Sequence, residues 1–289
     1  MVHMEVNCEG CAGCCIDWRP LTDADVDHER EGPYTPLDDT YNLTPLTRTE
    51  IRTFLADGTA AALTPRFWSA ADGVTIDGHE LAAVGGEPVF FVGLRKVPKP
   101  VGPFDESPHW LRSCVFLDPT TLQCRIHDED RYPDQCASYP GHNLALDQET
   151  MCERVEASFG GERLLDDDPP EELDDLLLGP QALGEKLFVH PDPERLDGLI
   201  DRLVDGELRP EDRAECIAVA AASSPATTAI DEEHYEQYRE RALASTSWID
   251  DAIAEWTDRS DVLASPAPIP DIAAEVEDDR GAPGTSGWE

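Results

Sequence analysis

Basic residues are scarce in this chain, and lysine is the scarcest of them. Lysine and arginine together number 22 against 61 aspartates and glutamates, which gives the 289 residues a formal net charge of −39; only Lys96, Lys99 and Lys186 are lysines. Such an excess of negative charge repels nucleic acid and anionic lipid, so we expect neither as a partner. Because the acidic residues are spread over most of the chain, the composition favours a halophilic protein, whose self-repulsion is screened in concentrated salt.

Long apolar runs are missing too. No stretch is long enough to cross a bilayer, and the N-terminus lacks the basic and then apolar segments of a secretory signal. We therefore expect a cytoplasmic protein with no membrane partner, in a reducing compartment where structural disulfides are rare. An odd number of cysteines, nine, also leaves one unpaired in any disulfide scheme.

Common catalytic motifs are also absent. The sequence contains no Walker loop, no dinucleotide-binding glycine motif and no nucleophile elbow. Its many carboxylates include no isolated pair that would indicate general acid–base catalysis. We therefore assign no catalytic or organic-cofactor-binding residue. The sequence leaves enzymatic activity open and favours a binding role.

What the chain does have is a cluster of cysteines at its start, Cys8-x-x-Cys11-x-x-Cys14-Cys15. Thiolates are soft metal ligands, and this spacing lets one tight turn direct several sulfurs to one ion. The residues between them are small or polar and provide no apolar core for inert cysteines. Adjacent cysteines point in divergent directions in most backbone conformations, so one of Cys14 and Cys15 is available to a second ion or to a different metal of the same cluster.

Four later cysteines complete the predicted ligand set: Cys114, Cys124, Cys136 and Cys152. Eight sulfurs make two four-thiolate sites, or one cluster plus a structural ion. His127 and His142 are alternative ligands for a mixed site, and Tyr132, Tyr139 and Pro140 are expected to form an apolar wall beside the metal. Cys216 lies in an apolar helical run and is expected to be a buried core residue.

The segment after residue 113 is predicted to form a hairpin that pairs two of these cysteines. If it closes on Asp118, Pro119 and Thr120, Leu117 opposes Thr121, and Cys114 lies directly opposite Cys124. Pro133 suits a first helical position, which places Cys136 in the first turn of a short helix.

The pattern as a whole predicts an α+β fold, with an irregular cysteine-rich metal-binding domain that carries short β-hairpins, followed by a helical C-terminal region. We expect residues 1–160 to form the cysteine domain, 161–264 an acidic helical region that opens with a linker at 165–178, and 265–289 a disordered acidic tail. The expected elements are helices at 47–56, 193–205, 210–222 and 231–262, a hairpin turning at Asp77-Gly78, a strand at 88–94, and a proline loop at 98–103.

The cysteine pattern resembles that of the YkgJ-type cysteine-cluster family. The resemblance covers residues 1–155 and rests on the N-terminal cluster, on Cys114-x9-Cys124, and on Arg131-Tyr-Pro-Asp-Gln-Cys136-Ala-Ser-Tyr-Pro140. It implies a domain that chelates zinc or iron. Three positions depart from the family pattern: His127 replaces a common tyrosine, Tyr132 separates Arg131 from Pro133, and Ala137 replaces a usual arginine.

Three functions remain open at this stage. The first is a metal-binding protein that holds an iron–sulfur cluster, or a zinc or iron ion. Because the Cys-x2-Cys-x2-Cys spacing also occurs in ferredoxins, a 4Fe–4S cluster is favoured over zinc. The second is an Fe–S oxidoreductase or transferase, which needs an open coordination position or a cofactor cleft. The third is a protein-interaction module with structural zinc, whose protein partner the sequence does not identify.

Overall fold

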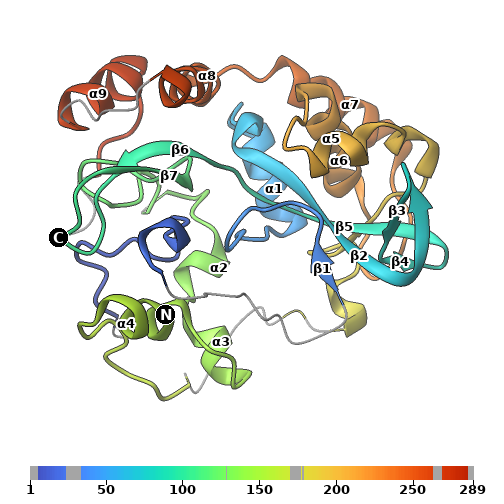
Figure 1. The fold of residues 1–289 in the computed structure, drawn as a ribbon. Coiled ribbons are helices and arrows are strands. Elements are labelled where there is room, and N and C mark those ends of the chain that lie inside the picture. The colour runs from blue at the N-terminus through green and yellow to red at the C-terminus, as the bar shows by residue number, and fades with distance from the viewer. Residues whose placement is uncertain are drawn as a thin grey trace. The chain divides into compact units, whose positions relative to one another are not determined.

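Figure 1 shows a computed structural model of the chain, which describes residues 6–23, 34–127, 129–169, 177, 179–262 and 269–285. The fold is mixed α+β, with short antiparallel sheets and a helical C-terminal region, as the sequence predicts. No helix among the described residues is long and apolar enough to cross a membrane.

The chain divides into two compact units, each discontinuous in sequence. The first, here termed the cysteine unit, comprises Met1–Val26, Lys96–Leu176 and Trp248–Glu289; the second, the sheet unit, comprises Asp27–Arg95 and Leu177–Ser247. The linear division expected at residues 160 and 264 does not coincide with these limits, because segments distant in sequence pack together. All eight predicted ligands belong to the cysteine unit, whereas Cys216 belongs to the sheet unit.

An antiparallel sheet of six strands forms the centre of the sheet unit. Its strands are β1 (Thr35–Pro36), β2 (Leu63–Ile76), β3 (His79–Leu81), β4 (Ala83–Val84), β5 (Glu87–Leu94) and β8 (Phe188–Val189). The hairpin between β2 and β3 turns at Asp77 and Gly78, both at positive φ, with Ile76 opposite His79. These are the features of a type I′ turn, which the Asp-Gly pair predicts.

Two helices of the sheet unit lie close to where the sequence predicts them. Helix α1 (Arg48–Ala56) begins with a capping box between Thr47 and Glu50. Helix α6 (Pro210–Ala222) has the predicted bounds and buries Cys216 completely, which confirms that Cys216 is a core residue. The other helical segments are η2 (Ala60–Ala62), η3 (Gly179–Ala182), η4 (Pro193–Leu196), α5 (Leu199–Val204) and α7 (Glu232–Ala244).

Two of the predicted helices are interrupted. The helix expected over 193–205 breaks at Gly198, whose left-handed backbone separates η4 from α5. The one expected over 231–262 is two helices, α7 and α8 (Trp248–Val262). Between them Ser245 has an extended backbone, and its hydroxyl donates a hydrogen bond to the Gly58 carbonyl and accepts one from the Ala60 amide. This tertiary contact ends α7 at a position that periodicity does not mark.

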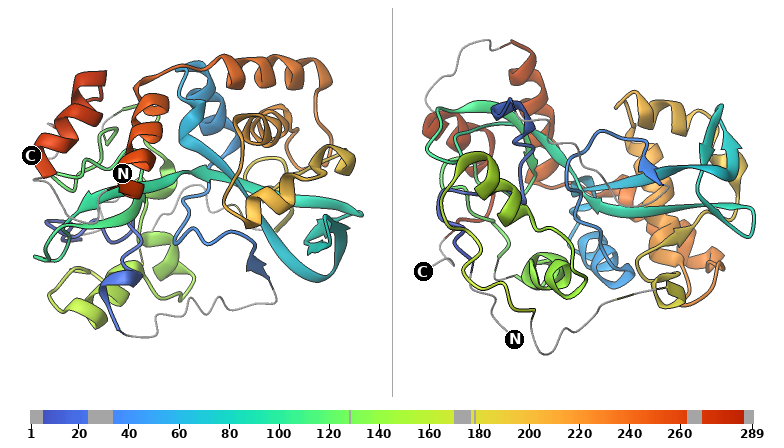
Figure 2. Two further views of the ribbon diagram at one scale, coloured as in Figure 1. Left: turned by 45° about the horizontal axis from the view of Figure 1, so that its top comes forward. Right: turned by 60° about the horizontal axis from the view of Figure 1, so that its bottom comes forward.

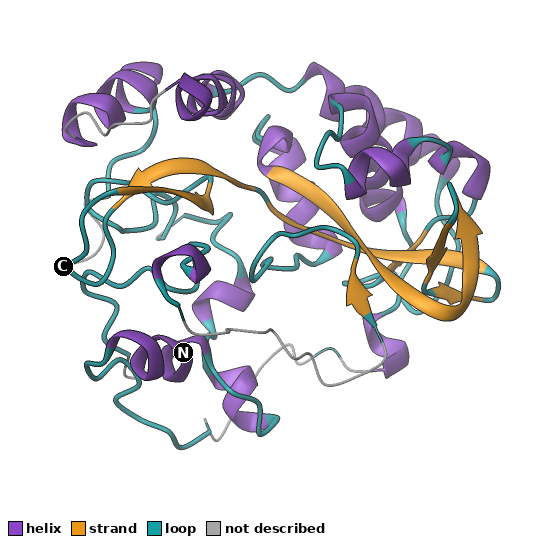
Figure 3. Cartoon of the chain, viewed as in Figure 1, coloured by secondary structure: helices purple, strands orange, loops and turns teal. Residues whose placement is uncertain are grey.

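The cysteine unit combines a short sheet with helices and long loops (Figures 2 and 3). Strands β6 (Lys96–Val101) and β7 (His109–Cys114) form a two-stranded antiparallel sheet. Pro98 and Pro100 were expected in a loop but lie within β6, which is acceptable because a strand at a sheet edge has one row of N–H groups outside the ladder. The remaining elements are η1 (Arg19–Leu21), α2 (Asp134–Ala137), α3 (Gly141–Ala145), α4 (Met151–Phe159), α8 (Trp248–Val262), α9 (Ile269–Val276) and η5 (Asp278–Arg280).

The C-terminal segment differs from the disordered tail that its composition predicts. Residues 269–285 contain α9 and η5, and bury Ile272, Ala273 and Val276 together with Glu277. Composition alone misses this segment because a few apolar residues and one buried acid fix its position. Residues 170–176, 178, 263–268 and 286–289, which include part of the expected linker and tail, lie outside the described residues.

Glu277 is the centre of a buried ionic network. Its carboxylate is fully buried and accepts from Lys99 Nζ at 2.6 Å, Arg125 Nε at 2.9 Å and Trp256 Nε1 at 2.9 Å. Lys99 also donates to the carbonyls of Val115 and Leu117 at 2.9 and 2.7 Å. The network therefore joins β6, the loop that precedes Cys124, and the C-terminal helices.

Arg125 extends the network to the turn beside the cysteines. Its guanidinium pairs with Asp118 at 3.1 Å and with Asp278 at 2.9 Å, and it donates to the Pro283 carbonyl at 2.7 Å. The C-terminal segment is thus tied to the hairpin that carries Cys124.

Replacement of Glu277 by glutamine should destabilise the protein strongly. The substitution leaves Lys99 and Arg125 buried without their shared anion, and the loss of one partner of a buried ion pair costs about 3–5 kcal/mol. Glu275→Gln is the matched control, since the Glu275 side chain is exposed and an exposed ion pair contributes about 0–1 kcal/mol. Denaturant unfolding at one fixed high salt concentration measures both. Equal stability of the two variants would contradict a structural role for the network.

Candidate metal centre

The N-terminal cysteine loop is held against β7 by backbone hydrogen bonds. The Cys114 amide donates to the Cys15 carbonyl at 2.8 Å, and the Asp17 amide donates to the Arg112 carbonyl at 2.8 Å. Ile16 and Ser113 form an antiparallel bridge between these two contacts. The adjacent cysteines at the end of the loop therefore lie beside Cys114, about a hundred positions later in the chain.

The same loop packs on α4, whose second residue is Cys152. The buried Trp18 indole places Nε1 3.3 Å from the Met151 Sδ, and its ring meets Phe159 edge-to-face. Gly13 approaches α4 so closely that a Cβ atom there would lie 2.7 Å from Val155 Cγ2. Only glycine fits this approach without displacement of the loop or the helix.

A third set of contacts fixes the start of the loop. The Asn7 amide donates to the Arg163 carbonyl at 2.7 Å, and Arg163 Nη1 donates to the Glu9 carbonyl at 3.1 Å. Residues 7–18 thus contact β7, α4 and the segment after α4.

The hairpin that carries Cys124 has a different register from the predicted one. Leu117 opposes Cys124, so the expected pairing of Cys114 with Cys124 is wrong. The reason is the Asp118 side chain, which accepts from the Thr120 and Thr121 amides at 2.8 and 3.2 Å and stabilises a longer turn. Strand β7 also ends at Cys114, where a tight turn begins.

Helix α2 places Cys136 in its first turn, as expected. Pro133 is the N-cap rather than the first helical residue, and the Cys136 amide donates to the Pro133 carbonyl at 2.8 Å. Despite the altered hairpin register, Cys124 still interacts with Cys114: the pKa of Cys124 is raised to about 12 by burial first and by the Cys114 thiolate second.

Burial raises the pKa of most of the other thiols. It is the main cause for Cys11, Cys114 and Cys152, and it acts with the neighbouring thiolates to bring the pKa of Cys8 to about 12, although Cys8 as a residue is exposed. Thiols that raise one another's pKa repel each other once ionised. A cation among them offsets that repulsion.

Cys14 is the exception, with its pKa lowered to about 7 by a hydrogen bond from the Cys15 thiol and by the Lys96 cation, against burial. The two sulfurs lie 3.7 Å apart, and the same hydrogen bond, together with burial, raises the pKa of Cys15. Lys96 Nζ lies 3.3 Å from the Cys14 carbonyl oxygen. Cys14 is thus the thiol prepared to ionise near neutral pH.

Two of the chain's three lysines lie at this site. Lys96 and Lys99 both act against burial to lower the pKa of Cys114. Neither was expected there from the sequence. The signal that points to them is the rarity of lysine itself, since two of three in so acidic a chain stand within one strand, β6.

Two tyrosines line the thiols, where the sequence predicts an aromatic wall. The pKa of Tyr132 is raised by burial and then by Cys136 and Cys124, and that of Tyr139 by burial and then by Cys14 and Cys152. The His127 ring packs on Tyr132 with centroids 4.9 Å apart, and His142 is buried with Nδ1 3.4 Å from the Ser138 hydroxyl. Ligation by either histidine stays a prediction.

The gathered thiols do not form a closed ligand shell. Among the described residues, which include all eight cysteines, no three Cys, His, Asp or Glu side chains are arranged as ligands of one ion. The donor chemistry nevertheless fits a soft metal, because the site collects thiols, nearby cations and aromatic cover.

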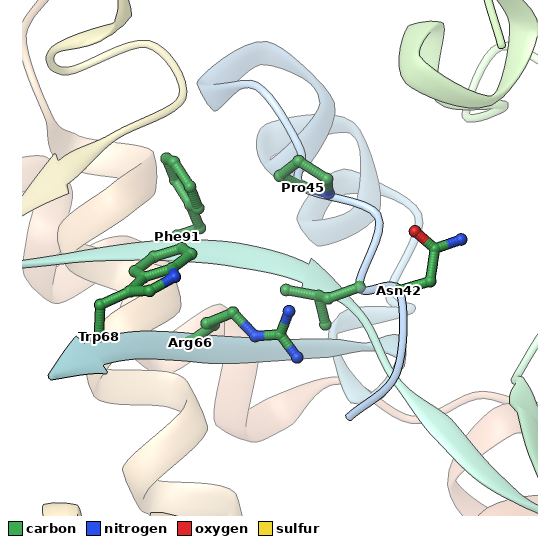
Figure 4. Close-up of a pocket in the computed structure, with 6 residues that line it drawn as sticks. Asn42, Pro45, Arg66, Trp68 and Phe91 are labelled. Carbon is green, nitrogen blue, oxygen red and sulfur yellow. The ribbon is translucent and has the colours of Figure 1, made fainter. Parts of the chain in front are cut away.

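A separate hollow lies in the sheet unit (Figure 4). It has a volume of about 410 Å³ including its open mouth, and is lined by Asn42, Leu43, Pro45, Arg66, Trp68 and Phe91. The Arg66 guanidinium is paired with the Asp38 carboxylate at 2.7 and 2.8 Å. Its lining includes no thiol, so we do not count the hollow as part of the metal centre.

Comparison with known proteins gives a family but no activity. No curated protein and no solved structure matches the chain. A family model matches nearly its whole length, so it covers the cysteine unit and the sheet unit alike. The chain belongs to the family described as "Family of unknown function (DUF7531)", whose model matches residues 4–289.

Proposed function

We propose that the protein binds metal through its clustered cysteine thiolates, and holds an iron–sulfur cluster or a zinc or iron ion. The observation that carries this proposal is the hydrogen bond from the Cys114 amide to the Cys15 carbonyl. It joins the N-terminal cluster to the later cysteines through the backbone, so their proximity does not depend on the conformation of the thiol side chains.

Electrostatics supports the same proposal. Although the chain has a net charge of −39, three cations, Lys96, Lys99 and Arg163, each act on at least one of these thiols. Positive charge at this position lowers the cost of bringing several thiolates together. A bound metal cation would offset the remaining repulsion between the thiolates.

An iron–sulfur cluster of the 4Fe–4S type is the favoured occupant. The Cys-x2-Cys-x2-Cys spacing suits it, and burial beside Tyr132 and Tyr139 limits the access of water, which is one of the ways a protein tunes such a cluster. No feature of the described residues singles out an oxidoreductase, a transferase or a protein-interaction module. The extreme charge and the free thiols fit a cytoplasmic protein of a high-salt cell.

Cys11→Ser should lose most of the bound metal and lower solubility. Cys11 is buried in the loop, and a serine hydroxyl is a poor ligand for soft metals. Cys216→Ser is the matched control, because Cys216 is also buried but lies in the sheet unit, and the metal content of this variant should equal that of the wild type. Elemental analysis after anaerobic purification in high salt measures both.

The same samples distinguish the occupants. Iron with acid-labile sulfide and visible absorption indicates the cluster, whereas zinc in a colourless protein indicates a structural ion. Full metal content in the Cys11 variant would count heavily against the proposal.

Metal affinity should rise steeply with pH. Because the pKa values of Cys8 and Cys124 are raised to about 12, their thiols are protonated at neutral pH, and each must release a proton to bind metal. For each proton that metal binding releases, the metal affinity rises about tenfold per pH unit. Release of two protons therefore raises the affinity about a hundredfold per pH unit. Competition titrations with a zinc chelator between about pH 6 and pH 8 measure the slope. An affinity independent of pH would show that these thiols are not the ligands.

A further inference from the structure

We infer that the hollow in the sheet unit binds a small, uncharged, flat aromatic or heteroaromatic molecule that carries a carbonyl group, such as an aromatic amide. The residues that line the hollow all belong to the sheet unit and include no cysteine, so the inference goes beyond the proposed metal binding and does not depend on it. The volume of about 410 Å³, open mouth included, lies at the lower end of the range for small-molecule sites, about 300–1,000 Å³.

Two aromatic rings and an arginine share one face of the sheet at the hollow. Arg66 and Trp68 are two positions apart on β2, and Phe91 of β5 lies directly opposite Arg66, so all three side chains project from the same face. The Trp68 and Phe91 rings meet edge-to-face with centroids 4.5 Å apart. Both rings are partly exposed, whereas Phe67 and Phe90, on the opposite face, are fully buried. The hollow therefore presents aromatic surface that the core does not cover.

The segment before α1 forms another wall of the hollow and is held in place by backbone contacts. Pro45 and Gly93 form an antiparallel bridge, and the Leu94 amide donates to the Thr44 carbonyl at 3.2 Å. Gly93 lies so close to this segment that a Cβ atom there would come within 2.4 Å of the Thr44 carbonyl oxygen and 2.7 Å of the Leu43 side chain. The wall is thus built into the fold of the sheet unit.

The charged group of the hollow is Arg66, whose side chain is only 3% exposed. Its Nε and Nη2 donate to the two oxygens of Asp38, and Nη2 also donates to the Thr40 carbonyl. Among the residues that the structure describes, no oxygen accepts a hydrogen bond from the third nitrogen, Nη1. The guanidinium lies among the lining side chains, beside Trp68 on β2 (Figure 4). A buried N–H group without an acceptor is unfavourable, and the carbonyl oxygen of a ligand would provide that acceptor.

The charge around Arg66 favours an uncharged ligand. Asp38 already neutralises the guanidinium through a paired contact. A ligand carboxylate would bring a second anion to the same guanidinium, in a chain of net charge −39. A neutral carbonyl accepts the hydrogen bond from Nη1 without that repulsion. Together with the aromatic walls, this donor favours a flat ring that carries a carbonyl.

Binding of benzamide to the full chain, labelled with fluorotryptophan and kept in concentrated salt, tests the inference. Of the chain's six tryptophans, Trp68 lines the hollow, and Trp68→Phe identifies its fluorine NMR resonance. Benzamide should shift that resonance and saturate in the millimolar range expected of so small a ligand. The resonances of Trp18 and Trp256, which are fully buried, should stay unchanged. No shift of the Trp68 resonance, or an equal shift of all of them, would overturn the inference.

Three related probes test the parts of the assignment on the wild type. Cyclohexanecarboxamide keeps the carbonyl but lacks the flat ring, and aniline keeps the ring but lacks the carbonyl. Each should bind about tenfold more weakly than benzamide. Benzoate keeps ring and oxygens but adds a charge, and it should also bind more weakly. Equal binding of all four probes, or tighter binding of benzoate than of benzamide, would contradict the assigned ligand class.

Arg66→Lys tests the donor directly. Lysine keeps a cation for Asp38 but lacks Nη1, so the affinity for benzamide should fall about tenfold. Arg48→Lys is the matched control, because Arg48 also pairs with a carboxylate of the sheet unit, that of Glu185, and lies outside the hollow. Its affinity for benzamide should equal that of the wild type. Full affinity in the Arg66 variant would overturn the role of Nη1, and the comparison of probes on the wild type decides the same point without a variant.

Discussion

The hydrogen bond between the Cys114 amide and the Cys15 carbonyl is the contact on which the candidate centre depends. It belongs to a short antiparallel pairing in which residues 15–17 run beside the end of β7, and it sets the distance between the two halves of the cysteine set. Packing of Trp18 and Gly13 on α4 holds the other side of the loop. Folding thus meets the entropic cost of bringing these distant segments together, whether or not a metal is bound.

The buried ionic network around Glu277 holds the hairpin that carries Cys124 in position. Asp118 shapes the turn that precedes Cys124, and it pairs with Arg125, which in turn binds Glu277. Lys99 connects the same carboxylate to β6. Lys99 thus pairs with a buried acid and also acts on Cys114, and Lys96 lies beside the Cys14 carbonyl on the same strand.

Local features of the fold were predictable from the sequence, and nonlocal ones were not. Thr47 and Glu50 mark the start of α1, and Asp77-Gly78 specifies the turn between β2 and β3. Both signals act within four residues. The register of Cys124 depends on hydrogen bonds from the Asp118 side chain, which lengthen the turn by an amount that strand alternation does not reveal. The end of α7 is set by Ser245 through a contact with Gly58, and helix α9 depends on Glu277 and its distant partners. Ligation by the cysteines stays a prediction from their spacing, and only the contacts of the loop with β7 and α4 show which cysteine-bearing segments lie together.

The metal's own coordination shell gives the most direct test of the central claim. X-ray absorption at the metal edge, on protein purified anaerobically in high salt, should show a first shell of sulfur alone, at about 2.3 Å for zinc. Sulfur with a second shell of iron would identify the cluster within the same account. A first shell of oxygen and nitrogen, or a folded protein that holds no metal, would contradict it.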